Sequence, residues 1–135
     1  MRLLRGLAAR GLLTIIPAMA YMLLILEDPD QRATRTREEG EAVFQRMVDF
    51  ADELKKQDKL LAVESLASQH KGARVQVRGG RSQVLDGPFA EAKEMVGGFF
   101  LVNVKTREEA LALARRCPAA EWATVEVRET APCYL

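Results

Sequence analysis

A chain of 135 residues, 48% hydrophobic and 29% charged, can bury a core as one domain without disulfides or a metal. Its formal net charge of +1 argues against direct binding to nucleic acid, which needs a strongly basic face. Two cysteines and one histidine argue against a disulfide framework and a zinc site. We therefore expect reduced thiols in a cytoplasmic protein without a cofactor.

Residues 1–18 differ from the rest, because they are basic and loosely apolar and carry no acidic residue. They fit three interpretations. A secretory signal would want an unbroken apolar stretch, which Arg10 interrupts; a membrane-surface segment would be basic and amphipathic; an extension would precede a start at Met19. We favour the third and expect the domain to span residues 19–135. No run in the chain approaches the roughly 20 apolar residues of a membrane span.

The body of the chain opens with a strand and a helix. Residues 21–26 form a continuous apolar run bounded by the polar stretch 27–30, which is typical of a buried strand ended by a turn. Residues 36–39 (TREE) have the pattern of a helix capping box. The helix that follows is expected to cover one face of a sheet with one apolar stripe, made of Val43, Phe44, Met47, Val48, Ala51 and Leu54.

A β-hairpin is predicted in the middle of the chain. After a strand at residues 60–66, residues 73–78 alternate between apolar and polar side chains, and residues 81–85 form another short strand. Gly79 and Gly80 lie between these two strands. A tight hairpin turn needs positive φ at both central positions, so two glycines there are a strong hairpin signal.

The stretch DGPF at residues 86–89 ends the hairpin. Residues 90–95 are expected to make one helical turn. Gly97 and Gly98 then open the apolar run 99–104, which predicts another buried strand.

A second helix and a last strand complete the chain. Residues 106–109 (TREE) repeat the capping-box pattern, and Pro118 terminates the helix. Its apolar stripe is Ala110, Leu113, Ala114 and Cys117. Residues 124–128 alternate and predict a strand. Trp122 is expected to pack at the end of this strand or in a dimer interface.

This order of elements predicts an α+β fold, a ferredoxin-like plait with an inserted β-hairpin. Both helices can cover only one face of the sheet. The runs 21–26 and 99–104 lack alternation, which is typical of strands buried on both faces. We expect a second copy of the chain to cover the other face, giving a homodimer.

Several segments of the sequence are similar to one known family. They are KGARV at 71–75, the glycine pair of the hairpin, DGPFAEAKE at 86–94, GGF at 97–99, TREEA at 106–110 and RRCP at 115–118. With these the chain resembles the YCII-related family, specifically its DGPF-domain branch, over residues 19 to about 130. The resemblance implies a dimeric α+β barrel. Members of the wider family are suspected of enzymatic activity because a histidine and an aspartate meet in a cleft. Some DGPF proteins are encoded with, or fused to, extracytoplasmic-function sigma factors, which implies a regulatory role instead.

Asp86 is the sharpest candidate for a functional residue. At a strand end, its carboxylate can be partly buried and act as a general base. It can equally form a turn by accepting backbone amides, and the two roles can coexist. His70, in a loop, is the second catalytic candidate, although nothing in the sequence brings it to Asp86. The candidates for ligand binding are Arg74, Gly87, Pro88, Phe89 and Lys93.

Two functions follow from these residues. The first is a small-molecule or enzyme-like cleft near Asp86, which predicts an enclosed pocket with that carboxylate facing it. The second is a non-catalytic accessory or regulatory dimer associated with sigma-factor-dependent transcription. It predicts that backbone hydrogen bonds occupy Asp86 and that no pocket exists. No residue pattern identifies a substrate.

Overall fold

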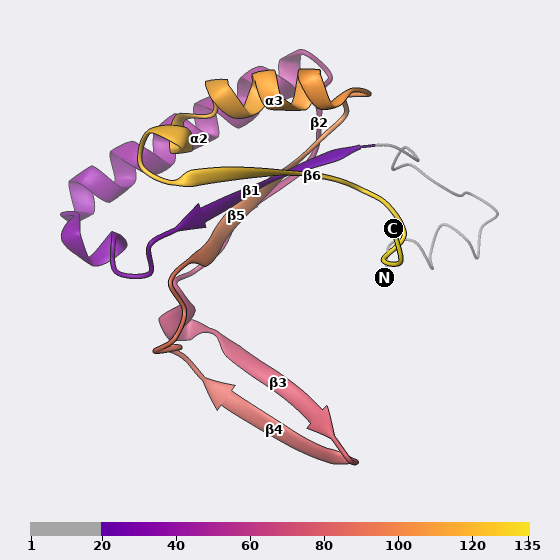
Figure 1. The fold of residues 1–135 in the computed structure, drawn as a ribbon. Helices are drawn as coiled ribbons and strands as arrows, with labels where there is room; N and C mark the ends of the chain where they lie inside the picture. The colour runs from indigo at the N-terminus through magenta and orange to yellow at the C-terminus, as the bar shows by residue number, and fades with distance from the viewer. Residues whose placement is uncertain (1–19) are drawn as a thin grey trace, which may run out of the picture.

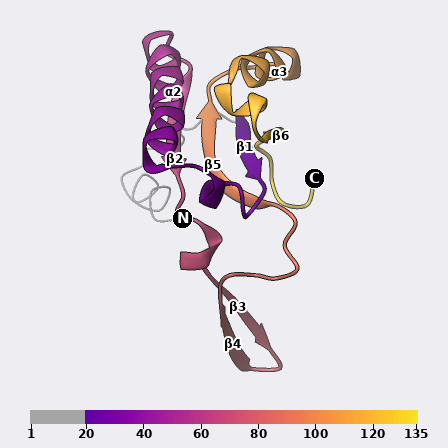
Figure 2. The same cartoon turned by 90° about the vertical axis from the view of Figure 1, so that its left-hand side faces the viewer.

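The computed structural model describes residues 20–135, so the expectations for residues 1–18 and for a start at Met19 lie outside the described part. Figure 1 shows two helices over one face of a sheet, with a hairpin projecting on the opposite side. Figure 2 shows the same hairpin from a second direction, again clear of both helices. The described chain is thus a mixed α+β fold.

The main sheet has four antiparallel strands in the order β2-β5-β1-β6. They are β1 (Tyr21–Glu27), β2 (Leu60–Ser65), β5 (Met95–Val102) and β6 (Thr124–Glu129). With the two helices they follow the βαββαβ order that the sequence predicts, and the hairpin is inserted between β2 and β5. The sheet is open, with β2 and β6 at its edges. A closed barrel is not formed within residues 20–135 of one chain.

Helix α2 (Arg37–Lys56) begins as predicted. The Glu39 amide donates to Thr36 Oγ1 at 3.1 Å, and the Thr36 amide donates to Glu39 Oε1 at 2.9 Å. Both bonds of the capping box are therefore present. Of the apolar stripe along this helix, only Leu54 is fully buried, together with Phe50.

Helix α3 (Arg107–Arg116) begins with only half of the predicted capping box. Thr106 Oγ1 accepts from the Glu109 amide at 3.1 Å. The Glu109 carboxylate accepts from the Thr106 hydroxyl at 3.1 Å and not from its amide. The predicted stripe is confirmed, because Ala110, Leu113, Ala114 and Cys117 are all buried.

The core lies between the helices and the near face of the sheet. Tyr21, Leu23 and Ile25 of β1 point to this face and are buried. Phe50 meets Phe100 of β5 edge to face, with ring centroids 5.3 Å apart. The other face of β1 carries Met22, Leu24 and Leu26, which are only half-buried. The strand therefore alternates in burial, although its sequence is apolar throughout.

The hairpin consists of β3 (Ala73–Arg78) and β4 (Arg81–Asp86). Its turn is the predicted one, with φ of +58° at Gly79 and +77° at Gly80. Every residue of both strands is exposed. A short 3-10 turn, η2 (Gln69–Lys71), lies where the chain leaves the sheet to enter the hairpin.

Strand β5 begins earlier than the sequence predicts. Residues 90–95 do not form a helical turn; the Ala92 amide donates to the Phe89 carbonyl at 3.0 Å in a single turn, and Met95 already pairs with Glu27. Gly97 and Gly98 therefore lie within the strand and do not open it. Both have a packing reason to lack a side chain: a Cβ on Gly98 would lie 2.7 Å from the backbone carbonyl oxygen of Glu64, and a Cβ on Gly97 would overlap the side chain of Glu27.

Candidate functional site: a groove between helix α2 and the sheet

A groove of about 760 Å³ lies between the first half of α2 and the sheet. The stripe residues Val43, Met47 and Val48 are half-buried and line it, and Phe44 beside them is 54% exposed. On the sheet side, Gly98 lines the groove without a side chain to fill it. The predicted stripe of α2 is confirmed in part: Leu54 is buried, and Met47 and Ala51 pack against the core. Val43, Val48 and the exposed Phe44 line the groove, and the buried Phe50 was not predicted.

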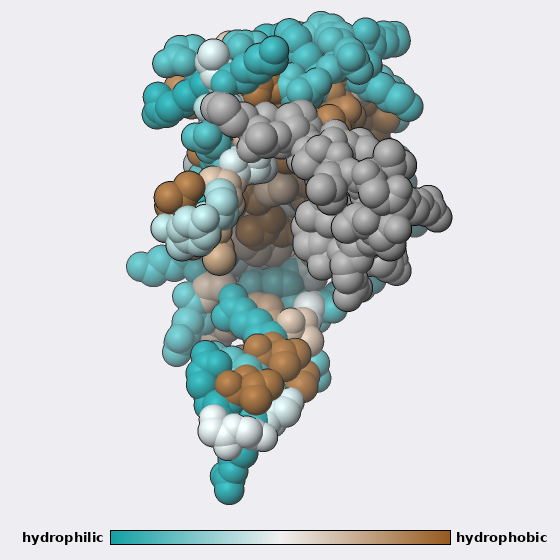
Figure 3. Space-filling model, turned by 90° about the vertical axis from the view of Figure 1, so that its right-hand side faces the viewer, coloured by the Kyte–Doolittle hydropathy of each residue, from teal (hydrophilic) through white to brown (hydrophobic). Residues whose placement is uncertain are grey.

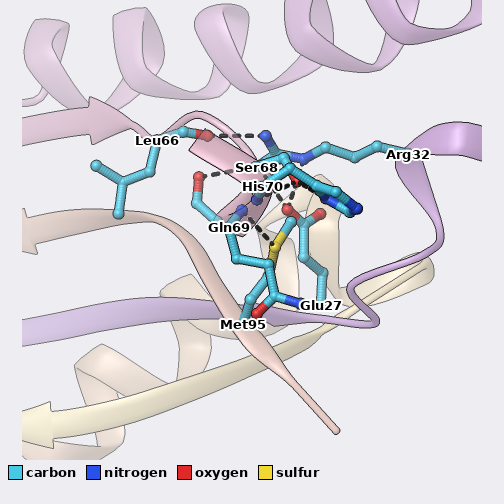
Figure 4. Close-up of polar contacts among 8 residues, drawn as sticks. Glu27, Arg32, Leu66, Ser68, Gln69, His70 and Met95 are labelled. Carbon is cyan, nitrogen blue, oxygen red and sulfur yellow. Dashed lines mark hydrogen bonds and ion pairs between the residues drawn. The ribbon is translucent and has the colours of Figure 1, made fainter. Parts of the chain in front are cut away.

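Glu27 provides the polar end of the groove. It is the one charged side chain among residues 20–135 that is buried, at 5% exposure. Its Oε1 accepts from Arg32 Nε at 2.8 Å and lies 2.5 Å from Arg32 Nη2 (Figure 4). Arg32 also donates to the carbonyls of Leu66, at 2.8 Å, and Gly97, at 3.4 Å. The arginine thus neutralises a buried carboxylate and ties the loop after β1 to the neighbouring strands.

Gly97 explains how the carboxylate fits into the sheet. A Cβ atom at this position would overlap Glu27 Oε1 and would lie 3.0 Å from Arg32 Nη2. Glycine is therefore needed here for the close approach of a side chain to the backbone of β5.

The second oxygen of Glu27 is unused. Both Arg32 contacts go to Oε1, and Oε2 accepts no hydrogen bond from any residue in the range 20–135. A carboxylate oxygen with spare acceptor capacity can bind a donor group or take up a proton.

Trp122 forms part of the rim of the groove, immediately before β6. Its carbonyl accepts from Gln31 Nε2 at 2.8 Å. The guanidinium carbons of Arg35 and Arg46 lie 5.8 and 5.3 Å from the ring centroid. Arg46 also pairs with Glu121 at 2.5 Å, and this hydrogen bond raises the pKa of Arg46 and lowers the pKa of Glu121. Trp122 is half-buried, so its indole can report on ligands in the groove.

The two predicted catalytic residues lie outside the groove. Asp86 is exposed at the end of β4, so the partial burial expected for its carboxylate is not found. Its side chain accepts no backbone amide of residues 20–135 either, contrary to the turn-forming expectation. His70 is exposed in η2, with Nδ1 2.9 Å from Ser68 Oγ. No hydrogen bond joins His70 to Asp86 in the described chain.

His70 nevertheless lies at the same end of the sheet as Glu27. The amide of Gln69, its neighbour, donates to Met95 Sδ at 3.5 Å, and Met95 pairs with Glu27 across the strands. Figure 4 shows the Ser68–His70 turn beside the Glu27–Arg32 pair. Catalytic roles for Asp86 and His70 stay predictions.

Residues 86–89 form the base of the hairpin. The Gly87 amide donates to the Gly72 carbonyl at 2.9 Å. A Cβ on Gly87 would overlap the carbonyl oxygen of Gln69, so this glycine permits close contact between the hairpin base and η2. These contacts account for the glycine without a ligand.

The other predicted ligand-binding residues surround this base. The Arg74 guanidinium carbon lies 3.9 Å from the centroid of the Phe89 ring, and that ring is buried. Pro88 and Lys93 are exposed. None of the five predicted residues lines the groove, and their role in ligand binding stays a prediction.

Glu27 and Arg32 were not predicted from the sequence. Residues 27–30 were expected to bound the first strand as a turn, whereas Glu27 is the last residue of β1 and continues the alternation of that strand. Two features of the sequence hint at this pair: a glutamate at the end of one apolar strand, and a glycine pair beside a second apolar run. That signal becomes specific only in the folded sheet, where a register shift in β5 leaves Gly97 without a partner in β1 and beside the Glu27 side chain.

Residues 20–135 contain neither a candidate metal site nor a membrane-spanning helix. No group of three or more histidine, cysteine, aspartate or glutamate residues there is arranged to hold a metal ion. No helix in this part of the chain has the length and apolar character of a membrane span. Cys117 is buried, which raises the pKa of its thiol, and Cys133 is exposed; both are free.

Comparison with known proteins adds a family to this geometry. The model of the YCII-related domain matches residues 19–133. An uncharacterized protein of Rhizobium meliloti (strain 1021) is 32% identical over 97 residues, which make up 72% of this chain and 78% of that protein. The name of this relative states no activity, so the comparison suggests no function for the present chain. Because the family model covers most of the chain, the protein belongs to the YCII-related family, as the motifs in its sequence predict.

Proposed function

We propose that this protein binds a small, mainly apolar molecule in the groove beside α2, with Glu27 as its polar anchor. One observation carries the proposal: a buried carboxylate presents an unused oxygen to a groove whose size is typical of small-molecule sites. Arg32 holds Glu27 in place through two contacts to Oε1. If a reaction occurs, Glu27 is the residue placed to act as general base.

The walls and the anchor together define the ligand. Val43, Phe44 and Met47 would contact an apolar body. The unused oxygen of Glu27 would accept from a hydroxyl or amine on that body, and charge-assisted bonds of this kind are the stronger ones. Arg35 and Arg37 also line the groove, so the preference for a donor rests on contact with the unused oxygen of Glu27 and is tested by comparing an amine with an acid.

We further propose that two copies associate through the face of the sheet that no described helix covers, which is called the uncovered face below. That face carries Met22, Leu24, Leu26 and Phe99 on its central strands. Charged side chains flank them at the edges, such as Arg128 on β6. An apolar centre with a charged rim is the usual organisation of a protein interface. A two-fold pairing of such sheets would give the barrel implied by the family resemblance.

The alternative function is a non-catalytic regulatory role in sigma-factor-dependent transcription, which the resemblance implies. The observation that favours a role in protein contacts is the exposed apolar surface of the hairpin. In that case the groove would bind nothing. A catalytic cleft at Asp86, assisted by His70, remains a separate prediction that does not depend on the groove.

Trp122 is the single tryptophan of the chain, so its fluorescence provides a direct test. The probes are hexylamine, hexanol and hexanoate, which share one apolar body and differ in the polar group. We expect the amine and the alcohol to change the fluorescence saturably and the hexanoate to bind more weakly. Glu27→Gln should weaken the amine about tenfold or more, because it removes the charged acceptor.

Glu38→Gln provides the matched control, since Glu38 is an exposed carboxylate on α2 that does not line the groove. It should leave the binding of all three probes unchanged. Equal affinity for the amine and the hexanoate, or equal effects of the two substitutions, would reject Glu27 as the anchor. If no probe binds at millimolar concentration, the groove proposal fails and the regulatory alternative gains support.

A further inference from the structure

The two faces of the hairpin differ in character. Val75, Val77 and Val84 are 64%, 58% and 64% exposed. Val75 pairs with Val84 and Val77 with Ser82, so the three valines share one face. The opposite face has one apolar residue, Leu85 at the base, and is otherwise polar: Arg74, Gln76, Arg78, Arg81 and Gln83. Such alternation is typical of strands that bury one face.

Within the described chain nothing buries this face. The contacts that anchor the hairpin lie at its base, where Gly87 meets Gly72 and Arg74 lies over Phe89. A two-stranded hairpin is marginally stable in water unless a hydrophobic face is packed against something. The valine face therefore needs a partner.

The position of the hairpin indicates which partner. In Figure 1 the helices lie on one side of the sheet, and the hairpin projects on the other side, toward the uncovered sheet face. Figure 3, viewed from the right of Figure 1, shows hydrophobic side chains on the hairpin and a recessed hydrophobic area between it and the helices. A body seated on the uncovered face would meet the hairpin as well.

We infer that the hairpin is a dimerisation arm, whose valine face packs on a second copy of the chain seated on the uncovered sheet face. The inference rests on the homodimer proposed above and extends it. In a two-fold dimer each copy would give its arm to the other and receive one in return. With a net charge of only +1, two copies do not repel each other strongly.

The area that a stable dimer needs favours this arrangement. Specific dimers bury about 800 Å² on each partner. The central row on the sheet face (Met22, Leu24, Leu26 and Phe99) is already half-buried, and Leu101 on the same face is buried. The hairpin adds Val75, Val77 and Val84, which are more exposed than any of these. A second copy that covers both surfaces therefore buries more apolar area than one seated on the sheet face alone.

The test compares two pairs of substitutions in the same two strands. The double variant Val75→Asp/Val84→Asp places charges on the valine face. Its matched control, Gln76→Asp/Gln83→Asp, places the same charges on the opposite face at the neighbouring cross-strand pair. We expect the first to weaken the dimer at least about 100-fold in analytical ultracentrifugation, because a two-fold interface contains every substitution twice. The control should leave the dimer constant nearly unchanged.

Leu24→Asp on the sheet face separates this inference from the dimer proposal. If the wild-type chain is monomeric at all concentrations, both fail. If Leu24→Asp dissociates the dimer and the valine variant does not, the dimer stands and the arm is refuted. Far-ultraviolet circular dichroism checks that each variant is folded.

A second measurement leaves the valine face intact. One sample of the protein carries a spin label at Gln83→Cys, in a Cys133→Ser background. It is mixed with isotope-labelled protein that carries no spin label. If the arm reaches across, the label broadens amide signals of the partner near its bound position. A dimer without any intermolecular broadening from this label would overturn the inference.

Discussion

The ion pair between Glu27 and Arg32 makes the sharpest test of how this fold is held together. The perturbation is Arg32→Met, which keeps an apolar stem and removes the guanidinium. Glu27 is 5% exposed and the Arg32 side chain 33% exposed. The substitution would leave a buried carboxylate with no counter-charge.

The expected cost follows from that geometry. Removing one partner of a fully buried pair typically costs about 3–5 kcal/mol. Here Arg32 is partly exposed and the groove admits water to Glu27, so we expect a smaller loss of about 2–3 kcal/mol in the free energy of unfolding. The substitution also removes the hydrogen bonds from Arg32 to the Leu66 and Gly97 carbonyls, and their loss adds to the expected destabilisation.

The assay is urea unfolding of a double-mutant cycle with Glu27→Gln. The two single substitutions should together cost at least about 1 kcal/mol more than the double variant, because the double variant leaves no unpaired charge. Arg37→Met is the control. Its pair with Glu41 has a similar distance of 2.9 Å, but the two side chains are 92% and 66% exposed. We expect no measurable change there.

Two results would refute this reasoning. If Arg32→Met is no more destabilising than Arg37→Met, burial of Glu27 does not matter energetically. If the cycle is additive, Arg32 acts through its backbone contacts and not through the carboxylate. Either result would also remove the support for a charged anchor in the groove.

Two further predictions concern the groove glycines and the first cap. Gly97→Ala should destabilise the protein by about 2–4 kcal/mol in urea unfolding, because its Cβ would overlap Glu27. The control Gly40→Ala lies in α2 with open space around it and should instead stabilise the protein by about 0.5–1 kcal/mol. Equal effects of the two substitutions would contradict this account. The capping box lowers the pKa of Glu39, chiefly through the Thr36 amide, below its ordinary value of 4.5. Its contribution to stability is therefore present above pH 4.5 and is lost as the pH falls through the lowered value. Unfolding experiments across this range should show that Glu39→Gln removes that part of the pH dependence; an unchanged profile would mean that the cap does not hold the carboxylate in solution.

Local features of the fold were readable from the sequence because they depend on neighbours in the chain. The capping box at Thr36 needs only a hydroxyl and a carboxylate three residues apart, and both of its bonds are formed. The hairpin turn needs positive φ at two adjacent positions, which Gly79 and Gly80 adopt. The stripes of the two helices follow from the helical period alone.

Features that depend on contacts distant in sequence were not readable. The run at residues 90–95 lacks a helix because the pairing of Met95 with Glu27 extends β5 backwards. The glycine pair 97–98 looks like a strand boundary in the sequence. In the structure it lies inside a strand, where Gly97 makes room for a carboxylate from β1.

The sequence thus determined the elements, their order and the family, because hydrophobic period, caps and turn residues act over a few positions. Tertiary structure alone decided where the candidate site lies. Half of the α2 stripe stands away from the sheet, and only the register of β1 on β5 brings Glu27 next to Gly97 and within reach of Arg32. The physical reason is that a buried charge is tolerable only where its partner and its space are supplied by other segments of the chain, and no local pattern records that arrangement.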